Sequence, residues 1–337
     1  MARSRILVSS LAVLASVVCL AGCTAQRTTG PGASEGGGPV RIGLITKTDT
    51  NPYFVTLRDA AKAAAVQQGA QLIALAGKFD GDNEGQVAAI ENLTQQGVKG
   101  ILITPSNSTG VLGAIKAARD RGITVIALDT ETDPKDAVDA TWATDNFAAG
   151  QKQGAYVKAA LKGATPKLLM LDGTPGSSVD TQRHGGFLKG FGISAGSPEI
   201  VGTAATNGDQ NTAQQSMENL LQRSADVNAV YTLNEPNARG AYAALNARGL
   251  TGKVVVGSID GGCQAMADLK AGHYAATVMQ FPKKMAADGV AAVLEYAKTG
   301  TKPTGFHDTG SELITDRPLP GLESEDTNFG TQNCWGD

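Results

Sequence analysis

The sequence predicts an α/β protein made of two doubly wound parallel-sheet domains. Short apolar runs alternate with stretches of helical periodicity along most of the chain, a rhythm typical of strand–helix–strand units in a parallel sheet. The runs are apolar at nearly every position, which indicates strands covered on both faces. The pattern occurs once before Asp145 and again after it. We therefore expect two such domains side by side.

The predicted elements follow one another in a regular order. In the first half the apolar runs are 41–46, 71–76, 100–104 and 124–129, and the helical stretches are 53–68, 85–96 and 109–121. In the second half the runs are 167–172, 199–204, 229–233, 253–259 and 275–280, and the helical stretches are 148–161, 212–222, 237–248 and 283–299. Glycine follows several helical stretches, as a left-handed C-terminal cap favours.

The N-terminus predicts export and lipidation. Arg3 and Arg5 precede the apolar stretch 6–20, which is too short for a membrane span and typical of a signal peptide over 1–22. The stretch ends in Leu-Ala-Gly before Cys23, which resembles the lipobox of bacterial lipoproteins, where this cysteine is acylated. Residues 23–39, rich in Gly, Ser, Thr and Pro, predict a flexible tether. We expect an extracytoplasmic protein anchored to the cell membrane by this lipid alone.

The remaining cysteines and the charge narrow the function classes. Cys19 leaves with the signal peptide, so Cys263 and Cys334 remain as a pair in an oxidising compartment and are expected to form a disulfide. Two distant cysteines offer too few ligands for a metal site. A net charge of −3 without a basic run disfavours nucleic acid. No P-loop is present and no G-x-G-x-x-G follows the first strand, so we expect no cofactor.

Polar and aromatic side chains follow the predicted strands in both halves. Ligands of open parallel sheets bind beyond the carboxyl ends of the strands. The residues found there are Asn51, Tyr53, Phe54, Asp129, Asn234, Asp260 and Gln280. Carboxylates and amides match sugar hydroxyls, and aromatic rings match the C–H faces of a sugar. Each residue alone also has a structural interpretation: a helix cap for Asn51, turns for the two aspartates, core for the aromatic pair and a surface charge for Arg183.

Other patterns point away from catalysis. Residues 192–196 match G-x-S-x-G, but a helical stretch precedes the motif and a Ser-Pro loop follows, the reverse of a nucleophile elbow. None of His184, His273 and His307 has ligand spacing to another. His184 could line the cleft beside Arg183, but we expect an exposed loop histidine. Asp129 and Asp260 could serve as the acid and base of a glycosidase, yet binding explains both. We therefore expect no enzyme activity.

Several segments together resemble one known family. The segments are 42–45, 51–54, 125–129, 182–187, 234–235, 259–261 and 278–282. They look like those of the ribose-type (type I) periplasmic sugar-binding proteins of ABC importers. The tail segments 260–263, 307–310, 318–321 and 334–336 look most like the fructose-binding branch.

The resemblance implies two lobes joined by a three-segment hinge, with crossovers near 143–145, 280–281 and 308–310. The N-terminal lobe would hold 40–143 plus 281–309, and the C-terminal lobe 144–280 plus 310–322. The tail 323–337 would be tied back by the disulfide.

The resemblance also implies a site and a mechanism. Positions that hold sugar hydroxyls in the family match Asn51, Asp129, Arg183, Asn234, Asp260 and Gln280, while Tyr53 and Phe54 match the aromatics beside the ring. A ribose receptor has an arginine where this chain has Thr130 and an aromatic residue where it has Asn207-Gly208, which disfavours ribose and suits a ketohexose or polyol.

The implied function is that of a monomeric, lipid-anchored sugar-binding protein of an ABC importer. It would close at its hinge on a fructose-like ketose, another pentose or hexose, or a polyol, and would then dock on the permease and its ATPase. The alternatives are a sugar sensor for a chemoreceptor or kinase and, less favoured, a glycosidase.

Overall fold

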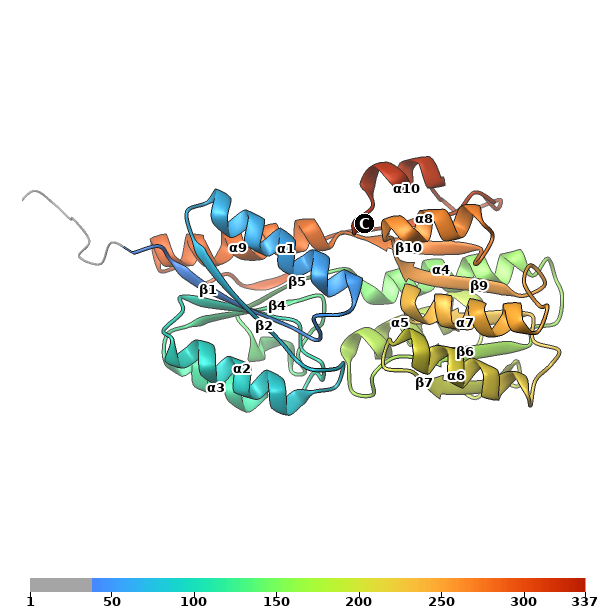
Figure 1. Ribbon diagram of the computed structural model, residues 1–337, viewed down its shortest axis with the longest axis horizontal. Helices are drawn as coiled ribbons and strands as arrows, with labels where there is room; N and C mark the ends of the chain where they lie inside the picture. Colours follow the sequence, from blue (N-terminus) through green and yellow to red (C-terminus); the bar gives the residue numbers. More distant parts are fainter. Residues whose placement is uncertain (1–37, 337) are drawn as a thin grey trace, which may run out of the picture. The chain divides into compact units, whose positions relative to one another are not determined.

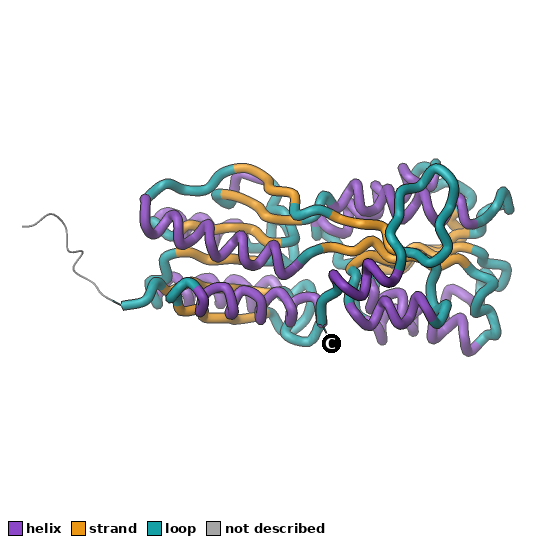
Figure 2. Tube along the Cα trace, turned by 90° about the horizontal axis from the view of Figure 1, so that it is seen from above, coloured by secondary structure: helices purple, strands orange, loops and turns teal. Residues whose placement is uncertain are grey.

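Two α/β lobes, each with one six-stranded sheet, make up the part of the chain that the structure describes (Figure 1). The structure is a computed structural model, and it describes residues 38–336. The predicted signal peptide, Cys23 and the tether up to residue 37 lie outside these residues. Seen from above, the strands of both sheets lie among helices (Figure 2). Within 38–336, no helix is both long and apolar enough to cross a membrane.

The first sheet is wholly parallel, with strand order β11-β5-β4-β3-β1-β2. Its strands are β1 (Arg41–Thr46), β2 (Gln71–Ala76), β3 (Gly100–Ile103), β4 (Thr124–Leu128), β5 (Ala140–Ala143) and β11 (Gly305–Asp308). Leu44 of β1 packs with α1 (Pro52–Gln67) and α9 (Pro282–Thr299). Its neighbour Ile45 packs with α2 (Asn83–Gln95) and α3 (Leu112–Asp120) on the other face. Because neighbouring residues of a strand point to opposite sides, these two contacts show that helices cover both faces of the sheet.

The second sheet repeats the design, with strand order β12-β10-β9-β8-β6-β7 and only β12 antiparallel to its neighbour. Its strands are β6 (Leu168–Asp172), β7 (Ile200–Ala205), β8 (Ala229–Thr232), β9 (Val255–Asp260), β10 (Ala276–Gln280) and β12 (Ser311–Ile314). Leu168 packs with α4 (Asn146–Ala160) and α5 (Ser178–Phe191). Leu169 packs with α6 (Gln210–Leu221), α7 (Glu235–Ala247) and α8 (Cys263–Lys270).

The chain passes between the two sheets at three places. It leaves β5 for α4, leaves β10 for α9, and leaves β11 for β12. The first and third passages are tied together, because Asp308 Oδ1 accepts hydrogen bonds from the backbone N–H groups of Asp145 (3.1 Å) and Gly310 (2.9 Å). The lobe boundaries stated above remain our proposal for where each lobe begins and ends.

Three helices differ from the prediction. For α5 the sequence predicted a helix only over residues 187–191. Helices α8 and α10 (Thr327–Asn333) were not predicted. Glycine weakens helical propensity, and α5 contains several glycines. Their role is packing: a Cβ at Gly186 would clash with the backbone O of Phe147 in α4, and one at Gly150 of α4 would clash with the backbone O of Arg183. Helices α4 and α5 can therefore pack backbone against backbone.

Candidate ligand-binding site

A small cavity between the carboxyl ends of the two sheets is lined by all eight residues that the sequence singled out. Its volume is about 30 Å³. Its lining comprises Asn51, Tyr53, Phe54, Asp129, Arg183, Asn234, Asp260 and Gln280, together with Lys47, Asp80, Val179 and Leu233. The first sheet's loops and the second sheet's strand ends thus present their polar side chains to one space.

Asn51 and the two aromatic residues open α1 and form one wall. Asn51 caps the helix, because its Oδ1 accepts the backbone N–H of Tyr53 at 3.0 Å, and Pro52 suits the first helical position. Tyr53 and Phe54 are both buried, with ring centroids 5.4 Å apart and planes at 83°. Burial raises the pKa of Tyr53 well above its usual value, so its hydroxyl stays protonated. The cap and core interpretations of these residues are therefore confirmed, and their role in ligand binding stays a prediction.

Asp129 follows β4 with its side chain in the cavity. It is 3% exposed, and its φ of 65° lies in the left-handed region. The backbone N–H donates to the backbone O of Trp142 at 2.9 Å, and Oδ2 accepts the hydroxyl of Thr130 at 2.8 Å. The cross-strand bond to β5 fixes the backbone, and one hydroxyl orients the carboxylate.

Arg183 lies on α5 and reaches the centre of the site. It is 2% exposed, which contradicts a surface charge. Its Nε donates to Asn146 Oδ1 at 2.7 Å, and its Nη1 donates to the backbone O of Leu233 at 3.0 Å. Nη1 also lies 3.6 Å from Asp260 Oδ1. A buried guanidinium with these partners is a fixed source of positive charge.

Asp260 and Gln280 stand at the ends of the adjacent strands β9 and β10. Gln280 Nε2 donates to Asp260 Oδ1 at 2.8 Å, and its Oε1 accepts the hydroxyls of Thr144 (3.1 Å) and Tyr53 (3.5 Å). Burial raises the pKa of Asp260 to about 6, against the opposing effects of Arg183 and Gln280. Asp260 is 3% exposed and has a φ of 151°, a second strained carboxylate position.

Asn234 caps α7 on the second lobe. Its Oδ1 accepts the backbone N–H of Asn237 at 3.0 Å, and its Nδ2 donates to the backbone O of Gly208 at 3.3 Å. Gly208 has a φ of 67°, and a Cβ there would stand 2.9 Å from Asn234 Nδ2. Glycine at this position thus leaves room for the amide.

Two charged residues of the cavity, Lys47 and Asp80, and one beside it, Glu235, were not predicted from the sequence. Lys47 directly follows β1 and is buried, and its Nζ lies 3.8 Å from Asp80 Oδ2. Asp80 follows β2, and burial raises its pKa although Lys47 opposes the shift. Glu235 lies behind Asp260, and burial followed by the Asp260 charge raises its pKa. The rule that located Asp129 also applies to Lys47, because each follows a strand of the first sheet.

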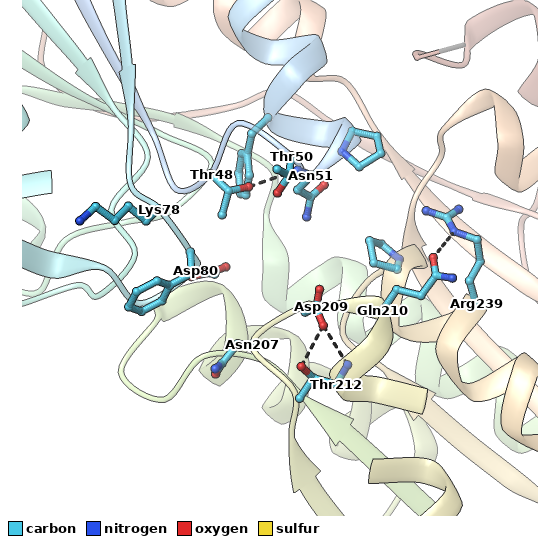
Figure 3. A pocket seen from close by; sticks show the side chains of 15 residues that line it. Thr48, Thr50, Asn51, Lys78, Asp80, Asn207, Asp209, Gln210, Thr212 and Arg239 are labelled. Atoms are coloured by element: carbon cyan, nitrogen blue, oxygen red, sulfur yellow. Dashed lines mark hydrogen bonds between the residues drawn. The ribbon is translucent and has the colours of Figure 1, made fainter. Parts of the chain in front are cut away.

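A larger chamber shares part of its lining with the small cavity. Figure 3 shows the side chains that line this chamber. Its volume is about 690 Å³, and it shares Asn51, Phe54 and Asp80 with the inner cavity. Thr48, Thr50, Asn207, Gln210 and Thr212 are among the other residues that line it. These hydroxyl and amide side chains alternate with apolar residues such as Phe79 and Pro236, and the lining again comes from both lobes.

The patterns set aside in the sequence serve other roles. Helix α5 ends at Phe191 with Gly192 as a left-handed cap, so Ser194 lies in the following loop and not on a strand-to-helix turn. His184 is not an exposed loop histidine: it lies on α5, with Nδ1 2.7 Å from Asp172 Oδ1, and this contact raises its pKa. No cluster of three or more His, Cys, Asp or Glu side chains suited to a metal occurs within 38–336.

The family model and the most similar curated relatives both point to periplasmic binding proteins. Residues 42–302 match the model of a periplasmic binding protein domain. The ribose import binding protein of Salmonella typhimurium is 34% identical over 250 residues, covering 74% of this chain and 82% of the relative. The D-allose-binding periplasmic protein of Escherichia coli is 27% identical over 263 residues, 76% and 84% of the respective chains.

Solved structures agree with these relatives. The crystal structure of an Agrobacterium vitis ABC transporter solute-binding protein with bound D-fucose has a TM-score of 0.77 and 27% identity, covering 88% of this chain and 99% of that one. A galactofuranose-binding protein has a TM-score of 0.78 and 25% identity, with coverages of 87% and 98%. These relatives are binding proteins, not enzymes, and fructose is the named ligand of none of these four.

Proposed function

Because the chain belongs to the periplasmic binding protein family and is a sugar-binding component of an ABC importer, we propose that it holds one monosaccharide or polyol between Asp129 and Asp260. The proposal rests on one observation: polar and aromatic side chains from both lobes line a single cavity. Carboxylates accept from hydroxyls, while the amides of Asn234 and Gln280 and the guanidinium of Arg183 donate to sugar oxygens.

Binding proceeds by hinge motion in this proposal. A cavity of about 30 Å³ is far below the ~300–1,000 Å³ of pockets that hold small molecules, so the lobes must separate to admit a sugar. The polar contacts that separation must break lie mainly between residues 107–131 of the first lobe and 175–182 of the second, and they include the bond from the backbone N–H of Ser108 to the backbone O of Gly176 (2.9 Å) and the bond from Ser178 Oγ to the backbone O of Glu131 (3.0 Å). Gln182 Nε2 donates to Glu131 Oε2 at 2.7 Å, and the backbone N–H of Ser178 donates to Ser108 Oγ at 3.0 Å. A sugar that contacts both lobes then favours the closed form, and the outer chamber is the route of entry.

A fructose-like ketose is our first candidate ligand, ahead of ribose. Thr130 and Gly208 are small residues beside the site, and the cavity's only cations are Lys47 and Arg183 among the residues that line it. Compared with a ribose receptor, these residues leave more room and offer fewer hydrogen-bond donors. Such a site suits a larger, differently branched sugar or a polyol. Other pentoses and hexoses remain part of the proposal, since the relatives include proteins named for ribose and D-allose.

A ligand panel tests this proposal. Fructose, ribose, allose, xylose, galactose, inositol and several polyols are screened by thermal shift, and those that raise the melting temperature are titrated by calorimetry. We expect at least one sugar to bind, to be recovered chemically unchanged, and to lose tenfold or more affinity in Asp260→Ala. A panel without any stabilising sugar contradicts the proposal, and turnover of a glycoside supports the glycosidase alternative.

We also propose that the lipid on Cys23 keeps the protein at the outer face of the cell membrane, beside its permease. The support is the sequence of residues 1–23, which lie outside the described residues. In a bacterial host fed a clickable fatty acid, the wild-type chain should be labelled and sediment with membranes. Cys23→Ala should be unlabelled and released, and labelling of that variant contradicts the assignment.

A further inference from the structure

One tryptophan outside the inner cavity touches three of its residues. The indole N–H of Trp335 donates to the backbone O of both Asp260 and Gln280, at 3.1 Å each. Its ring lies edge-on to Tyr53, with centroids 5.3 Å apart and planes at 79°. The side chain is 4% exposed. A single buried ring thus contacts the ends of β9 and β10 in the second lobe and the start of α1 in the first.

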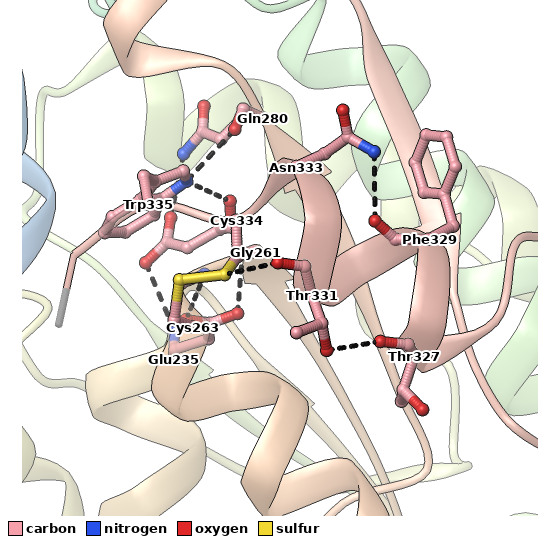
Figure 4. The surroundings of a disulfide bond; sticks show 12 residues. Glu235, Gly261, Cys263, Gln280, Thr327, Phe329, Thr331, Asn333, Cys334 and Trp335 are labelled. Atoms are coloured by element: carbon pink, nitrogen blue, oxygen red, sulfur yellow. Dashed lines mark hydrogen bonds between the residues drawn. A yellow bond between two sulfur atoms is a disulfide. The ribbon is translucent and has the colours of Figure 1, made fainter.

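The segment that carries Trp335 is held by the second lobe. Helix α10 packs on α8, and Cys334 forms a disulfide with Cys263, the first residue of α8 (Figure 4). The backbone N–H of Cys263 donates to the backbone O of Trp335 at 2.9 Å. Cys334 packs against the second-lobe core, whereas Trp335 belongs to the first-lobe core together with Tyr53. We call residues 327–336 the C-terminal strap, because it joins the two cores within two residues.

The contacts of Trp335 bear on the direction of two ligand-facing side chains. Asp260 has a φ of 151° and Gly261 a φ of 84°, so the turn after β9 is in a conformation that few residues adopt unaided. The indole N–H fixes the carbonyl of that turn and also the carbonyl of Gln280, where the chain crosses to α9. A buried carbonyl that loses its donor is destabilised, so without the indole the carbonyl side of the turn would relax, while Glu235 still accepts the backbone N–H groups of Gly261 (2.7 Å) and Gly262 (3.1 Å).

We propose that Trp335 is a positioning residue for the sugar site and that the Cys263–Cys334 disulfide keeps it there. It acts through Asp260, Gln280 and Tyr53 without touching the sugar. The affinity readout of this proposal rests on the proposed function, whereas its structural readout does not.

Two substitutions separate the ring from its N–H group. Trp335→Phe keeps an aromatic ring and removes the donor, while Trp335→Ala removes both. The matched control is Trp142→Phe, because Trp142 is the other tryptophan of the chain and its ring stacks on His307 with centroids 4.1 Å apart. D-fructose, D-ribose and D-allose are titrated by calorimetry. For each sugar that binds, we expect about fivefold weaker binding in Trp335→Phe and about 30-fold in Trp335→Ala. The control should match wild type.

Fluorescence and the disulfide give readouts that a purely structural role would not move. Trp142→Phe, in which Trp335 is the only tryptophan, should change its emission on sugar addition, and Trp335→Phe should not. The double variant Cys263→Ser/Cys334→Ser should lose affinity toward the level of Trp335→Ala. A Trp335→Phe protein with a lowered melting temperature and wild-type affinity overturns the positioning role.

Hydrogen exchange tests the strap without any sugar. We expect faster amide exchange over 258–263 and 279–282 in Trp335→Phe, and wild-type exchange in Trp142→Phe. Unchanged exchange in Trp335→Phe overturns the proposal. Faster exchange in a chain that binds none of the three sugars supports the strap and counts against the proposed ligand set alone.

Discussion

The two strand-end aspartates look alike in position and differ in how firmly they are held. Asp129 and Asp260 are both 3% exposed, and both have positive φ. The carboxylate of Asp129 accepts the hydroxyl of Thr130 at 2.8 Å, and it also lies near enough to the Tyr53 hydroxyl to contribute, after burial, to the raised pKa of Tyr53. Asp260 has Gln280 at 2.8 Å, Arg183 at 3.6 Å and the backbone N–H of Glu235 at 3.4 Å. The second lobe therefore presents a braced carboxylate, and the first lobe presents one with fewer partners.

The largest expected effect on sugar affinity comes from changing Asp260, the braced carboxylate of the second lobe. Asp260→Asn removes the charge opposite the buried Arg183 and the strongest acceptor for a hydroxyl, so we expect sugar affinity to fall about 100-fold. Calorimetry with the best-binding sugar measures the change. A loss smaller than that of Asp129→Asn would reverse the comparison between the two lobes.

The second effect is a pH dependence that we expect from the braced carboxylate of Asp260. In the proposed site a sugar hydroxyl would donate to the ionised form of Asp260, whose pKa burial raises to about 6. Binding therefore strengthens as pH rises through 6, and we expect about tenfold weaker affinity at pH 5 than at pH 7.5.

The same shift gives the opposite sign for stability. A folded-state pKa above the unfolded value means that the contribution of Asp260 to stability falls as pH rises from about 4 to about 6 and is level above that. Asp260→Asn should flatten the affinity profile. Glu235→Gln is the control, because Glu235 is the neighbouring buried carboxylate, and a profile flattened by that variant alone would assign the titration to Glu235.

The third effect comes from changing Asp129, the carboxylate with fewer partners in the first lobe. Asp129→Asn keeps the shape, and asparagine tolerates a φ of 65°. We expect about fivefold weaker binding with little change in melting temperature, since one neutral hydrogen bond replaces a charge-assisted one. A loss of more than 50-fold would show that the first lobe is braced as firmly as the second.

The smallest effect concerns the hydroxyl that orients Asp129. Thr130→Ala removes the 2.8 Å bond to Oδ2, and we expect about threefold weaker binding. Thr132→Ala is the matched control: this threonine is also buried, and its hydroxyl has no partner among the residues that the structure describes. Equal losses in both variants would mean that packing, and not the bond to Asp129, sets the effect.

The sequence was informative where burial imposes a pattern. Continuous apolar runs predicted β1 and β4, and the residues after them led to Asp129 and its counterparts because parallel strands end at one edge. Strand β11 was missed because all four of its residues are exposed and carry no apolar pattern. Lys47 was passed over although it follows β1. Trp335 could not be foreseen, because its role depends on where the strap docks.

The backbone contact between α4 and α5 has a consequence for changing what this protein binds. Arg183 is carried on α5, and the backbone O of Arg183 faces Gly150 of α4, with no room for a methyl group between them. The spacing of two helices thus sets how far the guanidinium extends toward Asp260. Substitutions at such glycines would shift α5 and with it Arg183, and would thereby change which sugars bind. Laboratory evolution that varies only the residues lining the cavity would not include these positions.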